Sequence, residues 1–195
     1  MPRSNSALQP LAKRPVTVHN AYPGLKVDRR AIIRAIHILD AHLPSLRPSD
    51  GGESSLQAFD HELSLAFLTD PALARLHADF LDDPAPTDVI TFAGDPGAGL
   101  AGEICVSIDA ARRHAGGTGM RFSAELTLYL VHGWLHLAGH DDLAPGLKRR
   151  MRAAEARALG LLRSAGATPR FSLVSRGGLK GGFCPRQPGK ARCVL

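Results

Sequence analysis

The chain has 195 residues, 44% of them hydrophobic, which suits one globular domain with extensions. No apolar run reaches the roughly 18 residues needed to cross a bilayer, and residues 1–15 lack the apolar segment of a secretory signal. We therefore expect no membrane partner. The three cysteines form no CxxC pair, so the sequence predicts no disulfide framework and favours a cytoplasmic location.

The net charge of +6 is unevenly distributed along the chain. Residues 160–195 contain seven Arg or Lys and no Asp or Glu, and residues 1–15 contain three Arg or Lys and no acid. The segment between them is therefore acidic overall. Basic ends on an acidic centre fit electrostatic attachment to nucleic acid, and they fit solvated tails without a partner equally well.

The hydrophobic pattern alternates between strand and helix signals. Strands are predicted at residues 16–19, 54–68, 87–92 and 103–108. Helices are predicted after Asp28, from Asp70, over 110–115, from a cap at Ser123, and over 147–162, with a loop at 44–52. This alternation predicts a single α+β domain at 16–162, a mixed four-stranded sheet packed with about five helices. A flexible N-terminal extension, 1–15, and a basic Gly/Pro-rich C-terminal tail, 163–195, flank this domain.

Two histidines on the central helix, His132 and His136, are four residues apart. Residues at this spacing share a helix face with Cβ atoms roughly 5–6 Å apart, so both imidazoles can reach one ion at about 2.0–2.1 Å. Gly139 permits a turn out of the helix in a left-handed conformation, which would bring Asp142 over the same ion. Three protein ligands with an open fourth position are typical of catalytic zinc, and we predict one Zn²⁺ at the end of this helix.

Two other residues compete with Asp142 for the third position. His140 lies four residues after His136 and would be an alternative ligand if the helix continued past Gly139; Asp141 is a further one. Gly133 follows His132, so the chain lacks the glutamate base of H-E-x-x-H peptidases. We therefore assign no protein general base and expect a metal-bound water to be the nucleophile.

Four more residues are candidates for supporting roles. Asp88 and Glu103 could each orient a metal-bound histidine through its second ring nitrogen, with capping of backbone amides as the alternative. Arg112 and Arg113 could grip phosphates, with a solvated helix face as the alternative.

The run His132–Asp142 (H-G-W-L-H-L-A-G-H-D-D) resembles the H-G-x-L-H-L-x-G-x-D-H pattern of the YbeY family of metal-dependent endoribonucleases. Upstream, P-T-D-V-I-T-F at 86–92 and G-E-I at 102–104 match that family's strand patterns, and the resemblance covers residues 16–159. It implies a zinc-dependent, single-strand-specific endoribonuclease in 3′-end maturation of 16S ribosomal RNA and in ribosome quality control. Single-stranded RNA and the small ribosomal subunit would be its partners, with Arg112 and Arg113 as RNA contacts.

The chain departs from the family pattern at four positions. Asp142 stands where the third ligand is usually His, and His140 where the family often has Tyr. Leu81 stands where many members carry Arg, and His77 where the family often has Asn. An arginine near the metal would stabilise phosphate charge. Its absence keeps open a non-catalytic ribosome-assembly factor with a residual metal site. A metallopeptidase-like hydrolase is a separate alternative.

Overall fold

A computed structural model describes residues 13–49, 61–81 and 87–174 of the chain. Its main sheet contains β1 (Val16–Asn20), β3 (Glu62–Leu68), β5 (Leu100–Ser107) and β4 (Val89–Ala93), in that spatial order. β1, β3 and β5 run parallel, and β4 pairs antiparallel with β5. The mixed four-stranded sheet predicted from the sequence is confirmed. The expected start of the second strand, 54–60, lies outside the described residues.

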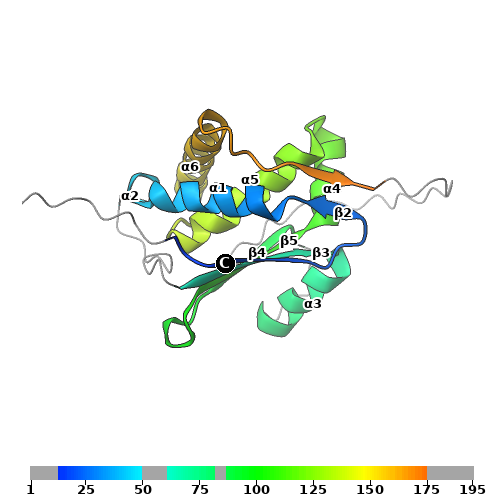
Figure 1. Cartoon of the computed structure of the whole chain (residues 1–195), viewed down its shortest axis with the longest axis horizontal. Coiled ribbons are helices and arrows are strands. Elements are labelled where there is room, and N and C mark those ends of the chain that lie inside the picture. The colour runs from blue at the N-terminus through cyan, green and yellow to red at the C-terminus, as the bar shows by residue number, and fades with distance from the viewer. Residues whose placement is uncertain (1–12, 50–60, 82–86, 175–195) are drawn as a thin grey trace, which may run out of the picture.

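The helices lie in two layers on this sheet. Figure 1 shows α3 (Asp70–Leu81) on one face and the other helices on the opposite face. That second layer consists of α1 (Arg29–Ala41), α2 (Leu43–Leu46), α4 (Ile108–Thr118), α5 (Phe122–Leu137) and α6 (Pro145–Ser164). The predicted α+β class is confirmed. The described residues form one helix more than the expected five or so because α2 occupies part of the expected loop at 44–52.

The core follows from the two-residue period of the strands, which sends alternate side chains to opposite faces of the sheet. Ile104 and Val106 of β5 are fully buried in the larger cluster, together with Trp134 of α5. Cys105, between them in sequence, belongs to the smaller cluster beneath α3, with Leu73. Glu103 shares the side of Cys105, so it faces α3 and not α5.

A second, two-stranded sheet was not predicted. β2 (Leu25–Val27) pairs antiparallel with β6 (Phe171–Leu173), and the Phe171 ring lies 5.6 Å from that of Phe67 on the main sheet. Residues 163–174, which the sequence analysis assigned to the tail, therefore finish α6 and form β6 against the domain. The rest of that tail, 175–195, and residues 1–12 lie outside the described residues.

Of the two helix caps predicted at Asp28 and Ser123, the structure confirms the first and not the second. Asp28 caps α1 as predicted, because its Oδ1 accepts from the amide of Ala31 at 3.1 Å. The predicted cap at Ser123 was wrong: α5 begins at Phe122, after Arg121, and the Ser123 hydroxyl accepts from the amide of Phe171 at 3.0 Å. This serine fastens β6 to α5. No helix in the described part of the chain is long and apolar enough to span a bilayer.

Candidate metal centre

Helix α5 crosses the sheet in close contact at Gly133. A Cβ atom added there would lie 2.5 Å from Cγ2 of Ile104 and 3.2 Å from Cγ2 of Thr91. Any side chain at 133 would therefore push α5 off β4 and β5. Close packing therefore explains why glycine stands at 133, the position at which zinc peptidases carry their glutamate base. The same contact fixes the distance of the neighbouring His132 from the sheet.

The two histidines turn their Nε2 atoms toward each other. The Nε2 atoms of His132 and His136 are 3.1 Å apart, and their ring centroids are 4.7 Å apart. Two nitrogens that bind one tetrahedral ion at 2.0–2.1 Å are about 3.3–3.4 Å apart. The pair is therefore arranged as two ligands of one zinc ion would be, with only a small adjustment of the rings.

A carboxylate that the sequence analysis missed holds the first histidine in place. The Nδ1–H of His132 donates to Oε1 of Glu155 in α6 at 2.7 Å, and both side chains are buried. This bond leaves the lone pair of Nε2 directed at His136. One signal in the sequence was available, because Glu155 interrupts the buried stripe of α6 formed by Met151, Ala154, Ala158 and Leu162.

Burial also sets the protonation state of the second histidine. Desolvation, assisted by the neighbouring His132, lowers the pKa of His136 to about 3. Its imidazole is neutral at physiological pH, which is the form that binds a metal.

The chain leaves α5 through the turn that Gly139 was expected to permit. Gly139 has φ 99°, and the amides of Gly139 and His140 donate to the carbonyls of His136 and Leu135, each at 2.9 Å. This is the Schellman pattern of helix ends. The backbone of His140 then lies close to the side chain of His136.

Within this loop the three candidate third ligands have different surroundings. Nε2–H of His140 donates to the carbonyl of Leu46 at 2.6 Å, which commits one of its nitrogens to α2. Oδ1 of Asp141 accepts from the amides of Asp142 and Leu143 at 2.6 and 3.0 Å, so Asp141 stabilises the turn. Asp142 is buried, with 6% of its surface exposed.

Across the described residues, no group of three His, Cys, Asp or Glu side chains is gathered closely enough to hold a metal ion. The structure therefore brings together His132 and His136 and supplies Glu155 behind them. Ligation by Asp142, or by its alternative His140, stays a prediction.

Glu103, one of the two residues expected to orient a histidine, lies on the face of the sheet opposite α5. Glu103 faces the α3 side, where its Oε1 accepts from the hydroxyl of Ser64 at 3.0 Å. The backbone carbonyl of Asp88 accepts from the amide of Ser107 at 2.8 Å. Glu155 makes the orienting contact for His132, and an orienting role for Asp88 stays a prediction.

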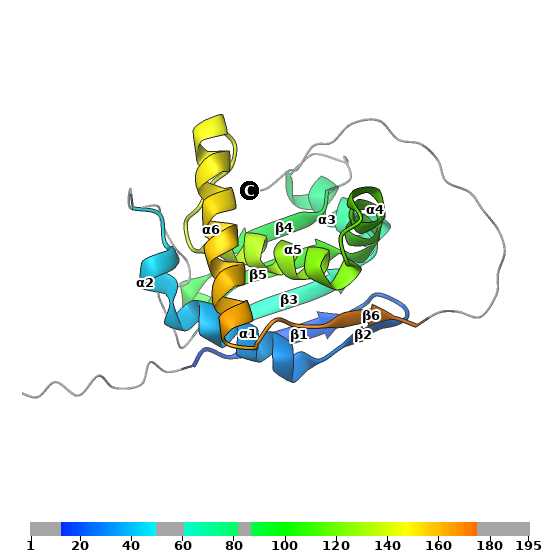
Figure 2. The same ribbon diagram turned by 90° about the horizontal axis from the view of Figure 1, so that it is seen from above.

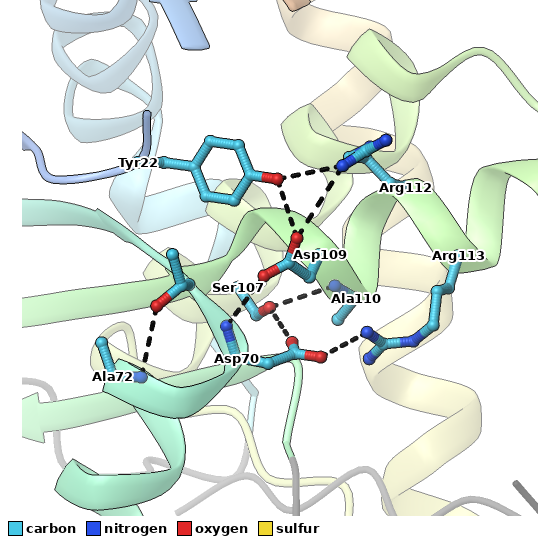
Figure 3. A network of polar contacts seen from close by, with 9 residues as sticks. Tyr22, Asp70, Ala72, Ser107, Asp109, Ala110, Arg112 and Arg113 are labelled. Carbon is cyan, nitrogen blue, oxygen red and sulfur yellow. Dashed lines mark hydrogen bonds and ion pairs between the residues drawn. The ribbon is translucent and has the colours of Figure 1, made fainter. Parts of the chain in front are cut away.

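Arg112 and Arg113 belong to a polar network at the carboxyl ends of the parallel strands (Figure 3). Arg112 donates to the Tyr22 hydroxyl at 3.0 Å, and that hydroxyl donates to Asp109 at 2.8 Å. Arg113 pairs with Asp70 at the start of α3. The network joins the loop after β1 to α3 and α4.

This network is remote from the histidines along α5. His114 of α4 lies 3.6 Å from Glu125 in the first turn of α5, whereas His132 and His136 occupy its last two turns. Both arginines are paired with carboxylates at the other end of the helix. Their contact with RNA stays a prediction.

Comparison with known proteins identifies the family to which this chain belongs. A family model described as "Endoribonuclease YbeY" matches residues 47–163, a segment that includes His132, His136, Asp142 and Glu155. The chain belongs to the YbeY family. Among curated relatives, each named endoribonuclease YbeY, the protein of Anaeromyxobacter dehalogenans is 41% identical over 112 residues, which are 54% of this chain and 58% of the relative.

Other YbeY relatives match different shares of the chain. The protein of Myxococcus xanthus is 40% identical over 105 residues, 51% of this chain and 36% of the relative. That of Salinibacter ruber is 29% identical over 151 residues, 72% of this chain and 87% of the relative. The chain thus spans less than two thirds of the length of the Anaeromyxobacter and Myxococcus proteins. A solution structure from Thermotoga maritima aligns over 84% of this chain with a TM-score of 0.48 and 18% identity.

Proposed function

We propose that this YbeY-family protein is a zinc-dependent endoribonuclease specific for single-stranded RNA. It would act in the cytoplasm on the 3′ end of 16S ribosomal RNA, in maturation of the small subunit and in ribosome quality control. The observation that carries the proposal is the 3.1 Å approach of the His132 and His136 Nε2 atoms, in a segment that matches the endoribonuclease family model.

The donor set fits zinc. Two neutral imidazoles would hold the ion from α5, and Asp142, in the loop that follows, would add an oxygen donor at the range zinc accepts. Zinc bound there would supply Lewis-acid activation of water and stabilise negative charge on a phosphodiester. An aspartate ligand adds one negative charge that a third histidine would not. A site with two histidines and one aspartate would therefore favour harder metals more than an all-histidine site would.

The chain's own residues prepare this site. Glu155 holds the proton of His132 on Nδ1, so that Nε2 is the free donor. Burial keeps His136 unprotonated. The tight contact at Gly133 fixes α5 against the sheet, so the two imidazoles need little reorganisation.

Cleavage assays test the proposal. The full chain, with one equivalent of zinc, is incubated with an end-labelled single-stranded RNA carrying a 16S 3′ terminus, with the same RNA annealed to its complement, and with casein. We expect cleavage of the single strand only, abolished by a chelator and by His136→Ala. Cleavage of casein alone would establish the metallopeptidase alternative. Wild-type RNA processing by a His136→Ala protein that still binds ribosomes would establish the non-catalytic assembly factor.

A further inference from the structure

The exposed charges of helix α6 are all positive. Its charged side chains at the surface are Lys148, Arg149, Arg150, Arg152, Arg157 and Arg163. The one acidic residue of the helix is Glu155, which is buried against His132. The face of α6 open to solvent therefore carries positive side chains and no acidic side chain of the same helix.

Three of these cations lie within seven residues N-terminal to Glu155, the residue of α6 that contacts His132. On a helix with 3.6 residues per turn, Lys148 and Arg152 fall within about 60° of Glu155, and Arg149 lies next to them. We call Lys148, Arg149 and Arg152 the α6 basic surface. Arg152 and Lys148 are one and two turns N-terminal to the residue that contacts His132. The same surface begins six residues after Asp142.

Figure 2 shows the N-terminal half of α6 extending beyond the end of α5, where it is not covered by the other labelled elements. Within the described part of the chain, no hydrogen bond or ion pair engages the side chains of Lys148, Arg149 or Arg152. The positive charge beside the site is thus available to a partner.

This arrangement works against the stability of the helix. The N-terminal end of a helix favours acidic side chains, and the first turn of α6 contains none. Lys148 and Arg152 are like charges at i and i+4, and Arg149 and Arg152 at i and i+3, which are unfavourable pairs. Unfavourable charge placements of this kind, with no compensating contact within the fold, are expected at functional sites.

We propose that the α6 basic surface binds the phosphate backbone of single-stranded RNA as the strand enters the site of His132 and His136. The identity of this polyanion rests on the proposed function. A membrane is a poorer fit, because helices that lie on membranes expose large apolar side chains on one face. None of the exposed large hydrophobic residues of the described chain lies on α6.

Binding is measured on full-length protein carrying His136→Ala, so that RNA is not cleaved during the assay. The test variant adds Lys148→Ala, Arg149→Ala and Arg152→Ala. The matched control adds Arg30→Ala, Arg75→Ala and Arg157→Ala, three exposed arginines on α1, α3 and the other side of α6. Both variants lose three positive charges, so they differ only in where the charge is removed.

Fluorescence anisotropy of a labelled 20-nucleotide RNA gives Kd over a range of salt concentrations. We expect the test variant to bind about tenfold or more weakly, and the slope of log Kd against log salt to fall by about 2, because each phosphate contact on a single strand contributes about 0.7. The control should bind within about twofold of the parent. A further variant with Lys148→Arg, Arg149→Lys and Arg152→Lys should retain binding.

Equal losses in the test and control variants would overturn the proposal, as would a parent protein that binds phosphatidylglycerol vesicles or an acidic protein but not RNA. Failure of this inference is distinguishable from failure of the proposed function. If RNA cleavage and Kd are unchanged by the three α6 substitutions, the proposed endoribonuclease activity is supported and the α6 basic surface is contradicted. If RNA binding depends on α6 but the zinc-loaded protein with His136 intact cleaves no RNA, the α6 basic surface is supported and the proposed endoribonuclease activity is not.

Discussion

The Nδ1–H of His132 donates to Oε1 of Glu155 over 2.7 Å, and this bond joins α5 to α6 in the protein interior. Such a carboxylate behind a histidine fixes the tautomer and the orientation of the ring, and it raises the basicity of the nitrogen that binds the metal. The nitrogen that it frees is the one facing His136. The contact that joins α5 to α6 therefore also orients His132 as a ligand of the proposed metal site.

Removing this carboxylate should weaken zinc binding. We expect Glu155→Ala to lower zinc affinity about 10- to 100-fold, and Glu155→Gln to lower it less, because the amide oxygen can still accept from His132. Competition with a chromophoric chelator measures both. As a control, Glu103→Gln, on the opposite face of the sheet, should leave zinc affinity unchanged. Wild-type affinity in Glu155→Ala would show that this contact only joins the two helices.

Gly133→Ala should destabilise the fold. The added Cβ would lie 2.5 Å from Ile104, and forcing an extra methyl into a packed interface costs about 1–3 kcal/mol. Gly160→Ala in α6 is the matched control, because its Cβ would meet nothing closer than 3.9 Å, and Ala is favoured over Gly in helices by about 1 kcal/mol. Chemical denaturation should give free energies of unfolding that change in opposite directions. An unchanged or raised stability of Gly133→Ala would contradict the close contact between α5 and the sheet.

Cys105 should be inert in the folded protein. Burial, assisted by the charge of Glu103, raises the pKa of its thiol from 9.0 to about 12, so the reactive thiolate is suppressed at neutral pH. Because the folded-state pKa of Cys105 is raised, its thiol contributes to the free energy of unfolding. This contribution is fully present below pH 9 and is lost as the pH rises toward 12. In a Cys184→Ser, Cys193→Ser protein, iodoacetamide at pH 8 should label Cys105 only after denaturant is added, as followed by mass spectrometry. Labelling of the native protein at the rate of a free thiol would contradict this burial.

Sequence patterns predicted those features whose cause is local. The i, i+4 spacing of His132 and His136 placed both imidazoles on one face of α5, and the structure brings their nitrogens to 3.1 Å. The helix end at Gly139 and the cap at Asp28 also depend on residues close in sequence, and both were predicted. The strand at 87–92 was predicted from its run of β-branched and apolar residues, which is also a local feature.

Features that depend on distant segments were not predicted. β2 and β6 have three residues each and pair across most of the chain, so neither is long enough to show a strand period. Ser123 carries a typical cap signal, but its hydroxyl is engaged by Phe171. The partner of His132 depends on how α6 crosses α5, and spacing within one helix contains no information about that crossing.

The central claim is that one zinc ion is held by His132, His136 and Asp142. Elemental analysis of the purified full-length protein, beside His136→Ala and Asp142→Ala and with Asp141→Ala as the matched control, tests it most directly. We expect about one equivalent of zinc in the parent and in Asp141→Ala, and a large loss in the other two variants, all with unchanged circular dichroism. A parent protein that binds no metal after incubation with zinc, or full zinc content in His136→Ala, would contradict the account.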